Sequence, residues 1–211
     1  MRAGIFGGTF DPIHTGHLIV AEEARIRLDL DQVLFMPAGR PWLKADQVIT
    51  EARHRMAMVE LAVESNPHFS ASDVEIKRPG PTYTVDTLEE MRGRLGPDSE
   101  IFAIMGLDLL KELGQWHEPH RLFEPATVVG MSRPGSPQFD PAVVDAIVPG
   151  ASARVVLLNG PMVEISGAEL RRRVSEGLSI RYQVPEVVEA YIREHRLYGG
   201  QRPHATESSV S

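Results

Sequence analysis

The chain of 211 residues contains no cysteine. This absence excludes disulfides, zinc–thiolate sites and thiol nucleophiles together. Long apolar runs are also missing, and the N-terminal stretch MRAGIFGGTF has glycines where a signal peptide would have its apolar segment. We therefore expect no membrane span and no secretion signal, and we expect a cytoplasmic protein.

Positive charge is scarce. The chain has 22 Lys and Arg against 29 Asp and Glu, which gives a formal net charge of −7. Non-specific nucleic-acid binding needs a basic face that neutralises phosphates, so we expect no nucleic-acid partner. A few local cations would still suffice for a small phosphorylated substrate. Hydrophobic residues, at 42%, are ordinary for a globular domain with a sizeable core.

Strand-like and helix-like patterns alternate along the chain. We predict strands over residues 3–6, 32–36, 69–76, 101–105, 126–131 and 154–158, and helices over 18–30, 53–64, 84–95, 107–113, 166–176 and 186–195. Parallel strands need crossovers, so this alternation predicts an α/β fold with a doubly wound parallel sheet, helices on both faces and a C-terminal helical segment. We expect a single domain over residues 1–198 and a disordered polar tail over 199–211.

The loop after the first predicted strand reads GGTFDPIHTGHL, residues 7–18. Glycines let the backbone approach a phosphate, and the N–H groups that open the next helix would point at it. His14 and His17 are three residues apart, so both rings can face one side and donate hydrogen bonds to a triphosphate. A glycine-rich turn alone is usually only a turn, and His-x-x-His is half of a metal site without a third ligand at supporting spacing. The full ordered motif nevertheless favours a phosphate site.

The segment GTFDPIHTGH resembles the signature of the HxGH nucleotidylyltransferases. Members share a Rossmann-like sheet and transfer a nucleotidyl group from a nucleoside triphosphate with release of pyrophosphate. The resemblance implies catalytic roles for His14 and His17. It also implies that ATP is contacted by the whole motif, namely Gly7, Gly8, Thr9, Phe10, His14 and His17.

Two further segments indicate the acceptor. Residues 73–92, DVEIKRPGPTYTVDTLEEMR, resemble the bacterial nicotinate mononucleotide adenylyltransferases, in which the threonine here numbered Thr84 helps hold the nicotinate carboxylate. Thr84 could also cap a helix, and a helix N-terminus suits a carboxylate. Residues 106–116, GLDLLKELGQW, resemble the next motif of that family. Gly106 would then contact ATP, Asp108 would accept from a ribose hydroxyl of either substrate, and Trp116 would stack on the pyridine ring, although a single Trp is more often a core residue.

Three further segments carry a lysine or an arginine that we expect to contact the substrates. PAGRPWLK, residues 37–44, resembles the family's PPHK-like loop, and the resemblance implies that Lys44 takes part in catalysis and contacts the mononucleotide; a solvated surface lysine is the alternative. EISGAELRRR resembles a closing ISSTxIR motif, which implies that Ser166 binds ATP and that Arg171 binds it and acts in catalysis. Arg133, in MSRPG, would contact the mononucleotide.

The closing motif also departs from the family pattern. Gly167 and Ala168 stand where a serine and a threonine are expected, which removes a hydroxyl contact to phosphate. Arg172 and Arg173 are interpreted as solvated.

The implied reaction joins ATP and nicotinate mononucleotide into nicotinate adenine dinucleotide and pyrophosphate. Mg²⁺ would be held by the substrate phosphates and water, without a protein metal cage. A homo-oligomer is left open. Two alternatives stay open as well: a related enzyme with another acceptor, such as nicotinamide mononucleotide or phosphopantetheine, and a non-catalytic nucleotide-binding protein, which the Gly167-Ala168 pair would favour.

Overall fold

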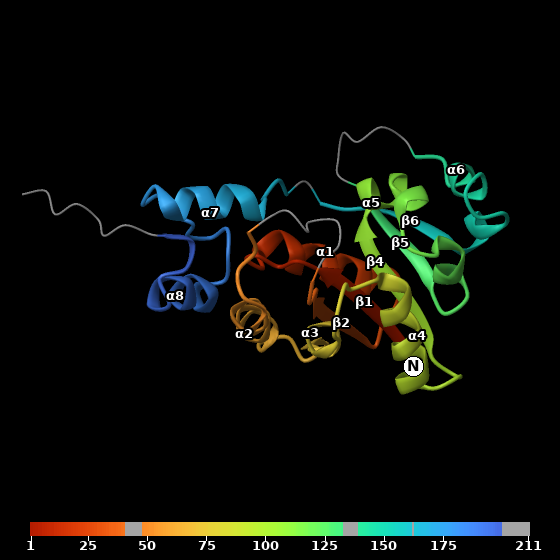
Figure 1. Ribbon diagram of the computed structural model, residues 1–211, viewed down its shortest axis with the longest axis horizontal. Coiled ribbons are helices and arrows are strands. Elements are labelled where there is room, and N and C mark those ends of the chain that lie inside the picture. The colour runs from red at the N-terminus through yellow and green to blue at the C-terminus, as the bar shows by residue number, and fades with distance from the viewer. Residues whose placement is uncertain (41–47, 133–138, 162, 200–211) are drawn as a thin grey trace, which may run out of the picture.

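A six-stranded parallel sheet forms the centre of the protein in a computed structural model that describes residues 1–40, 48–132, 139–161 and 163–199 (Figure 1). The strands are β1 (Arg2–Gly8), β2 (Gln32–Pro37), β3 (Phe69–Ala71), β4 (Glu100–Gly106), β5 (Thr127–Ser132) and β6 (Val155–Asn159). Their order in the sheet is β3-β2-β1-β4-β5-β6. The chain therefore winds outward from β1 through β2 to β3, returns to the other side of β1 with β4, and winds outward again. This is the predicted doubly wound sheet.

Helices connect the strands. They are α1 (Thr15–Arg27), α2 (Ala52–Val63), α3 (Val74–Lys77), α4 (Thr84–Leu95), α5 (Leu107–Lys111), α6 (Ala142–Asp145), α7 (Gly167–Ser175) and α8 (Glu186–Glu194), with 3-10 turns η2 (Leu113–Gln115), η3 (Pro119–Phe123), η4 (Ala151–Arg154) and η5 (Leu197–Gly199). In the described parts of the chain, none of the helices combines the length and apolarity that crossing a membrane requires.

Two hydrophobic clusters lie on opposite faces of the sheet, as the alternation of side chains along a strand requires. Phe6 of β1 belongs to the first cluster and Ile5 to the second. The first cluster includes buried residues of α1, α2, α7 and α8, such as Ala21, Val59, Leu170 and Val188. The second includes residues of α3, α4, α5 and η3, such as Val74, Leu88, Leu110 and Leu122. The C-terminal helices thus pack on the same face as α1 and α2 (Figure 1).

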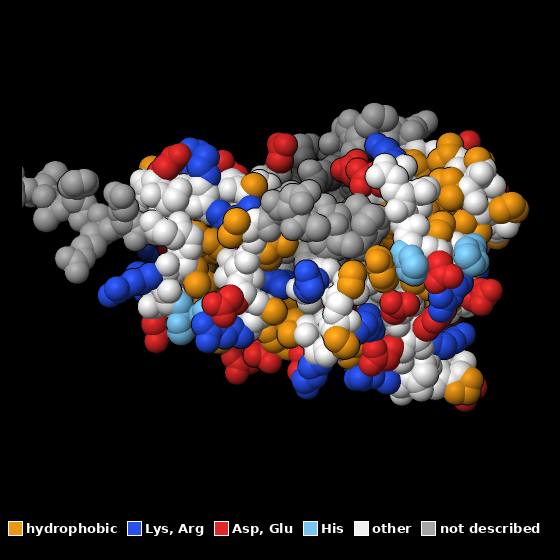
Figure 2. All heavy atoms as spheres, viewed as in Figure 1, with side chains coloured by type: hydrophobic (Ala, Val, Ile, Leu, Met, Phe, Trp, Pro, Cys, Tyr) orange, Lys and Arg blue, Asp and Glu red, His pale blue; other side chains and the backbone are white. Residues whose placement is uncertain are grey.

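Charged side chains of both signs are interspersed on the face drawn in Figure 2. Ion pairs also form within and between helices, such as Arg94 with Glu90 along α4 and Arg121 with Glu89 between η3 and α4. Exposed pairs of this kind contribute little to stability, so the two clusters must hold the fold together.

Three local predictions were wrong. The strand predicted over 69–76 ends at Ala71, and Val74–Lys77 forms α3, because the alternation of Val74 and Ile76 in a short segment imitates a strand. The first strand runs on through Gly7 and Gly8, and the positive φ of 49° that turns the chain falls on Phe10. On α2, the helical spacing of Met56, Val59 and Val63 predicts one shared apolar face, but Met56 is only partly buried, and the buried face is made of Arg55, Met58, Val59, Ala62 and Val63.

The C-terminal boundary was predicted at residue 198. The turn η5 includes Gly199, and the rest of the predicted tail lies outside the described residues.

Candidate active site

The sheet reverses its winding between β1 and β4, and the loops that carry the motif residues meet there. Phe6 of β1 pairs with Ile104 of β4, so the segments that follow Gly8 and Gly106 leave the sheet side by side. Gly8 also pairs with Pro37 at the end of β2. In doubly wound sheets, ligands bind beyond the carboxyl ends of the strands at this reversal. The fold therefore brings the histidine motif, Gly106 and Asp108 to one edge.

His14 and His17 form a stacked pair at the start of α1. Their ring centroids lie 3.6 Å apart and their planes differ by 20°. His14 is the N-cap residue of the helix, and its main-chain N–H donates to Nδ1 of His17 over 3.2 Å. Because Nδ1 accepts this bond, the neutral His17 ring carries its proton on Nε2. The helix start thus fixes both the orientation and the tautomer of His17.

A cluster of buried aromatic side chains packs against the His17 ring. The Phe10 ring is 2% exposed and meets the His17 ring edge-on, with centroids 5.0 Å apart. Phe10 also contacts Phe6 and Phe35 of the neighbouring strands. A Cβ added at Gly8 would lie 2.9 Å from the Phe10 ring, so the close approach of this ring depends on glycine. Phe10, predicted to contact ATP, therefore has its side chain in the core.

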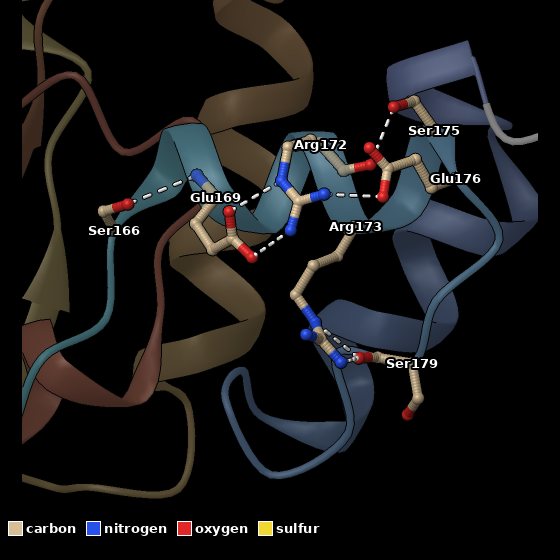
Figure 3. A network of polar contacts seen from close by, with 7 residues as sticks. All are labelled: Ser166, Glu169, Arg172, Arg173, Ser175, Glu176 and Ser179. Atoms are coloured by element: carbon tan, nitrogen blue, oxygen red, sulfur yellow. Dashed lines mark hydrogen bonds and ion pairs between the residues drawn. The ribbon is translucent and has the colours of Figure 1, made fainter.

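The N-terminus of α7 lies against the motif loop. Ser166 caps the helix, with its Oγ accepting the main-chain N–H of Glu169 over 3.2 Å (Figure 3). Arg171, one turn further on, donates from Nη1 to the main-chain oxygen of Asp11 over 2.6 Å. A Cβ added at Gly167 would lie 2.8 Å from that same oxygen. The glycine that departs from the ISSTxIR pattern thus stands at a close approach between α7 and the motif loop.

Arg172 and Arg173 point elsewhere. Arg172 forms ion pairs with Glu169 and Glu176 along the helix, and Arg173 donates from Nε and Nη2 to the main-chain oxygen of Ser179 (Figure 3). The side chain of Arg172 is 51% exposed. Both residues are surface groups, as the sequence indicated.

Thr84 begins α4, which packs against the second cluster, on the face of the sheet opposite α1. The alternative that Thr84 caps a helix is wrong, because Thr84 is the first residue of α4 and the extended Tyr83 is the N-cap. The Tyr83 ring stacks on His117, with centroids 4.2 Å apart. The start of α4 therefore lies beside the segment that carries Trp116.

Two of the four remaining candidates, Trp116 and Asp108, lie within the described residues. Trp116 packs half-buried against the second cluster, and its Nε1 is buried without a hydrogen-bond partner among the described residues. The Asp108 side chain is 70% exposed and faces Lys111 over 3.5 Å. Lys44 and Arg133 both lie outside the described residues.

The sequence reading missed a buried arginine beneath these loops. Arg55 of α2 is 1% exposed, and it donates to the main-chain oxygens of Thr50, Thr9 and Gly39 over 2.8, 2.9 and 3.3 Å. Burial lowers the pKa of Arg55, and the nearby Asp11 carboxylate opposes this effect. Arg55 lies one helical turn before the apolar residues Met58 and Val59, on the same face of α2. This spacing could have indicated from the sequence that Arg55 is buried.

Two buried carboxyl groups were missed as well. Asp11, in the motif loop, is 6% exposed and accepts from the Tyr198 hydroxyl and the Thr50 main chain. Glu75, in α3, is 5% exposed and accepts from the Thr87 hydroxyl over 2.8 Å. Burial raises the pKa of Glu75 to about 7, although the Thr87 hydroxyl and the positive Arg78 oppose this rise.

The fold and the site define a nucleotidyltransferase of the cytidylyltransferase-like class. Residues 5–173 match the family model with that description, "Cytidylyltransferase-like". A Thermomicrobium roseum protein named "Probable nicotinate-nucleotide adenylyltransferase" is 51% identical over 93% of this chain and 91% of its own length. A Thermus thermophilus protein of the same name is 48% identical over 94% of this chain and all (100%) of its own length. The chain belongs to the nicotinate-nucleotide adenylyltransferase family.

A solved structure shares this fold. Nicotinic acid mononucleotide adenylyltransferase of Plasmodium falciparum, complexed with NaAD, superposes with a TM-score of 0.76 at 22% identity and covers 95% of this chain and 98% of its own. The likeness extends to almost the full length of both chains.

Proposed function

We propose that the chain transfers the adenylyl group of ATP to nicotinate mononucleotide, which gives nicotinate adenine dinucleotide and pyrophosphate. The placement of the stacked His14 and His17 rings at the switch point carries this proposal, in a chain 51% identical to a relative named for the activity. A phosphate oxygen of the acceptor attacks the α-phosphorus of ATP, and the bond to the pyrophosphate oxygen breaks in line. The attacking phosphate is already an anion, so no covalent enzyme intermediate is needed.

The ATP side of the site is assigned to the motif loop and α7. His14 and His17 would donate to the phosphates, and the main chain from Gly7 to Phe10, together with Gly106 and Ser166, would face ATP. Arg171 and Lys44 would neutralise the charge that grows on pyrophosphate. The bond from Arg171 to Asp11 uses one of the five N–H donors of a guanidinium, which leaves others for phosphate oxygens.

The acceptor side is assigned to the start of α4 and the segment after α5. Thr84, at the N-terminus of α4, would meet the nicotinate carboxylate, because main-chain N–H groups there favour an anion. Asp108 would accept from a ribose hydroxyl, Trp116 would stack on the pyridine ring, and Arg133 would contact the mononucleotide. A neutral nicotinamide would lack the negative charge that the N-terminus of α4 favours.

Mg²⁺ bound to the phosphate oxygens would offset their charge. Within the described ranges, no three metal-ligating side chains gather into a possible cation site. Oxygens of the substrate and water would supply most of its ligands, because Mg²⁺ keeps several waters when it binds substrate phosphates. The cytoplasmic location and a homo-oligomeric state stay predictions.

Pyrophosphate release from ATP and Mg²⁺ would test the proposal, with nicotinate mononucleotide, nicotinamide mononucleotide and phosphopantetheine as parallel acceptors. We expect strong release with the nicotinate substrate and little with the other two. Release only with another acceptor would reassign the substrate. ATP binding without release in any of the three reactions would favour a non-catalytic protein.

A further inference from the structure

Asp11 is buried in the motif loop, three residues before His14. It forms hydrogen bonds with three residues that are distant in the chain: Thr50, Arg171 and Tyr198. Its Oδ1 accepts from the Tyr198 hydroxyl over 2.8 Å, and its Oδ2 accepts from the main-chain N–H of Thr50 over 3.1 Å. Its main-chain oxygen accepts from Arg171 over 2.6 Å. A buried carboxylate is stable only where donors satisfy its oxygens, so the position of Asp11 depends on these partners.

Tyr198 reaches Asp11 from the last described turn, η5, in an unusual backbone conformation. Its φ of 66° and ψ of 21° lie in the left-handed region, which a bulky side chain rarely adopts. Such a conformation persists where the surroundings impose it. Burial raises the pKa of Tyr198, and the Asp11 carboxylate raises it further, so the hydroxyl keeps its proton and remains a donor at neutral pH.

The same C-terminal segment holds the motif loop at a second point, just beyond His14. The main-chain N–H of Thr15 donates to the oxygen of Gln183 over 2.9 Å, and its hydroxyl donates to the oxygen of Tyr182 over 3.3 Å. Asp11 and Thr15 stand on either side of His14 in the chain. The backbone that presents the histidine pair is therefore fixed from both ends by residues 171–198.

We propose that Asp11 and Tyr198 are positioning residues for adenylyl transfer, whose hydrogen bond sets the main chain that aims His14 and His17 at the phosphates. This inference rests on the proposed function. Both residues act through the histidines. Transfer in line demands close alignment, and a displacement of about 1 Å in such a site can lower a rate about 100-fold.

Tyr198→Phe tests the proposal, because it removes only the hydroxyl. Tyr191→Phe is a matched control: the Tyr191 hydroxyl lies 2.9 Å from Nδ1 of His54, in the same C-terminal segment but away from the motif loop. We expect Tyr198→Phe to lose more thermal stability than Tyr191→Phe, because the Tyr198 hydroxyl serves a buried carboxylate, and both variants to stay folded at assay temperature. Only Tyr198→Phe should lower kcat, by about tenfold, with KM for both substrates within about twofold of wild type. A wild-type kcat in Tyr198→Phe, or equal kcat losses in both variants, would overturn the proposal.

Asp11→Asn provides a second test. Asparagine offers one carbonyl acceptor where the donors of Tyr198 and Thr50 converge, so we expect a similar fall in kcat. If the two residues act as a unit, the double variant Asp11→Asn/Tyr198→Phe should lose no more than the worse single variant. Losses that multiply would contradict the proposed pair. A wild-type protein inactive with every acceptor would overturn the proposed function and this inference with it. Active wild type with an unaffected Tyr198→Phe overturns the inference alone.

Discussion

The rings of His14 and His17 lie stacked at the start of α1, with their centroids 3.6 Å apart. Two parallel imidazoles at a helix start can meet the same phosphate group, so we expect His17→Ala to lower turnover by at least about 100-fold. Loss of the Nδ1 acceptor for His14 should cost about 1 kcal/mol of stability, which leaves the fold intact. Pyrophosphate release and thermal melting would check this. His68→Ala, on a ring bound to the main-chain oxygen of Asp31, is the control. An active His17→Ala, or an unfolded one, would contradict the assigned role.

The glycine that departs from the family pattern should be required in this chain. At position 167 a Cβ would lie 2.8 Å from the main-chain oxygen of Asp11, and backbone atoms cannot move aside cheaply. We expect Gly167→Ser to destabilise the protein by about 1–3 kcal/mol and to lower activity, because α7 carries Arg171 away from the loop. The neighbouring Ala168 is exposed, so Ala168→Ser should be almost neutral. Equal melting temperatures for the two variants would argue against the tight contact.

Much of the architecture could be predicted from local patterns. Buried strands such as β4 are continuous apolar runs, and α4 has its apolar residues Val85, Leu88 and Met91 at helical spacing. The motif loop and Gly106 fall at strand ends, so the sheet alone brings them together. The short helix α3 could not be recognised in this way, because four residues are too few to show a helical period.

The buried polar contacts that hold the loops of the site could not be predicted from the sequence. Asp11 and Tyr198 are 187 residues apart in the chain, and no local pattern links them. Arg55 could have been noticed on the buried stripe of α2, but its carbonyl partners lie in loops whose approach depends on the whole fold. Such buried polar groups are set by tertiary contacts rather than by local propensity.

The buried Glu75 should make stability fall as pH rises. Its folded pKa of about 7 lies above the ordinary value of 4.5, so the folded state binds this proton more tightly than the unfolded state does. Between these two pH values the free energy of unfolding should decrease by roughly 3 kcal/mol through this group. Urea unfolding at pH 5, 6, 7 and 8 would measure it. We expect Glu75→Gln to flatten the profile relative to wild type. Glu89→Gln, on the exposed side of α4, should leave it unchanged, and parallel profiles for wild type and Glu75→Gln would refute the assignment.

Substitution of Arg55 should destabilise the protein more than substitution of the other arginine on α2. Arg55 binds the loops after β1 and β2 at once, through the main-chain oxygens of Thr9, Gly39 and Thr50. Arg55→Met would leave three carbonyls without their donor and would remove one of the positive charges near the buried Asp11, so we expect a loss of about 3–5 kcal/mol. Arg53, on the same helix, has a side chain 74% exposed and pairs only with the exposed Glu51 among the described residues. Arg53→Met should therefore cost at most about 1 kcal/mol.

Arg55→Lys separates the charge of this residue from its geometry. Lysine keeps the positive charge but cannot reproduce the planar donor arrangement that meets three carbonyls, so we expect an intermediate loss of stability. If Arg55→Met does not fold, this variant still tests the role by urea unfolding and pyrophosphate release. Activity should fall even where low temperature restores stability, because the loops that flank the switch point lose a shared anchor. A Lys variant with wild-type turnover would show that charge alone suffices at this position.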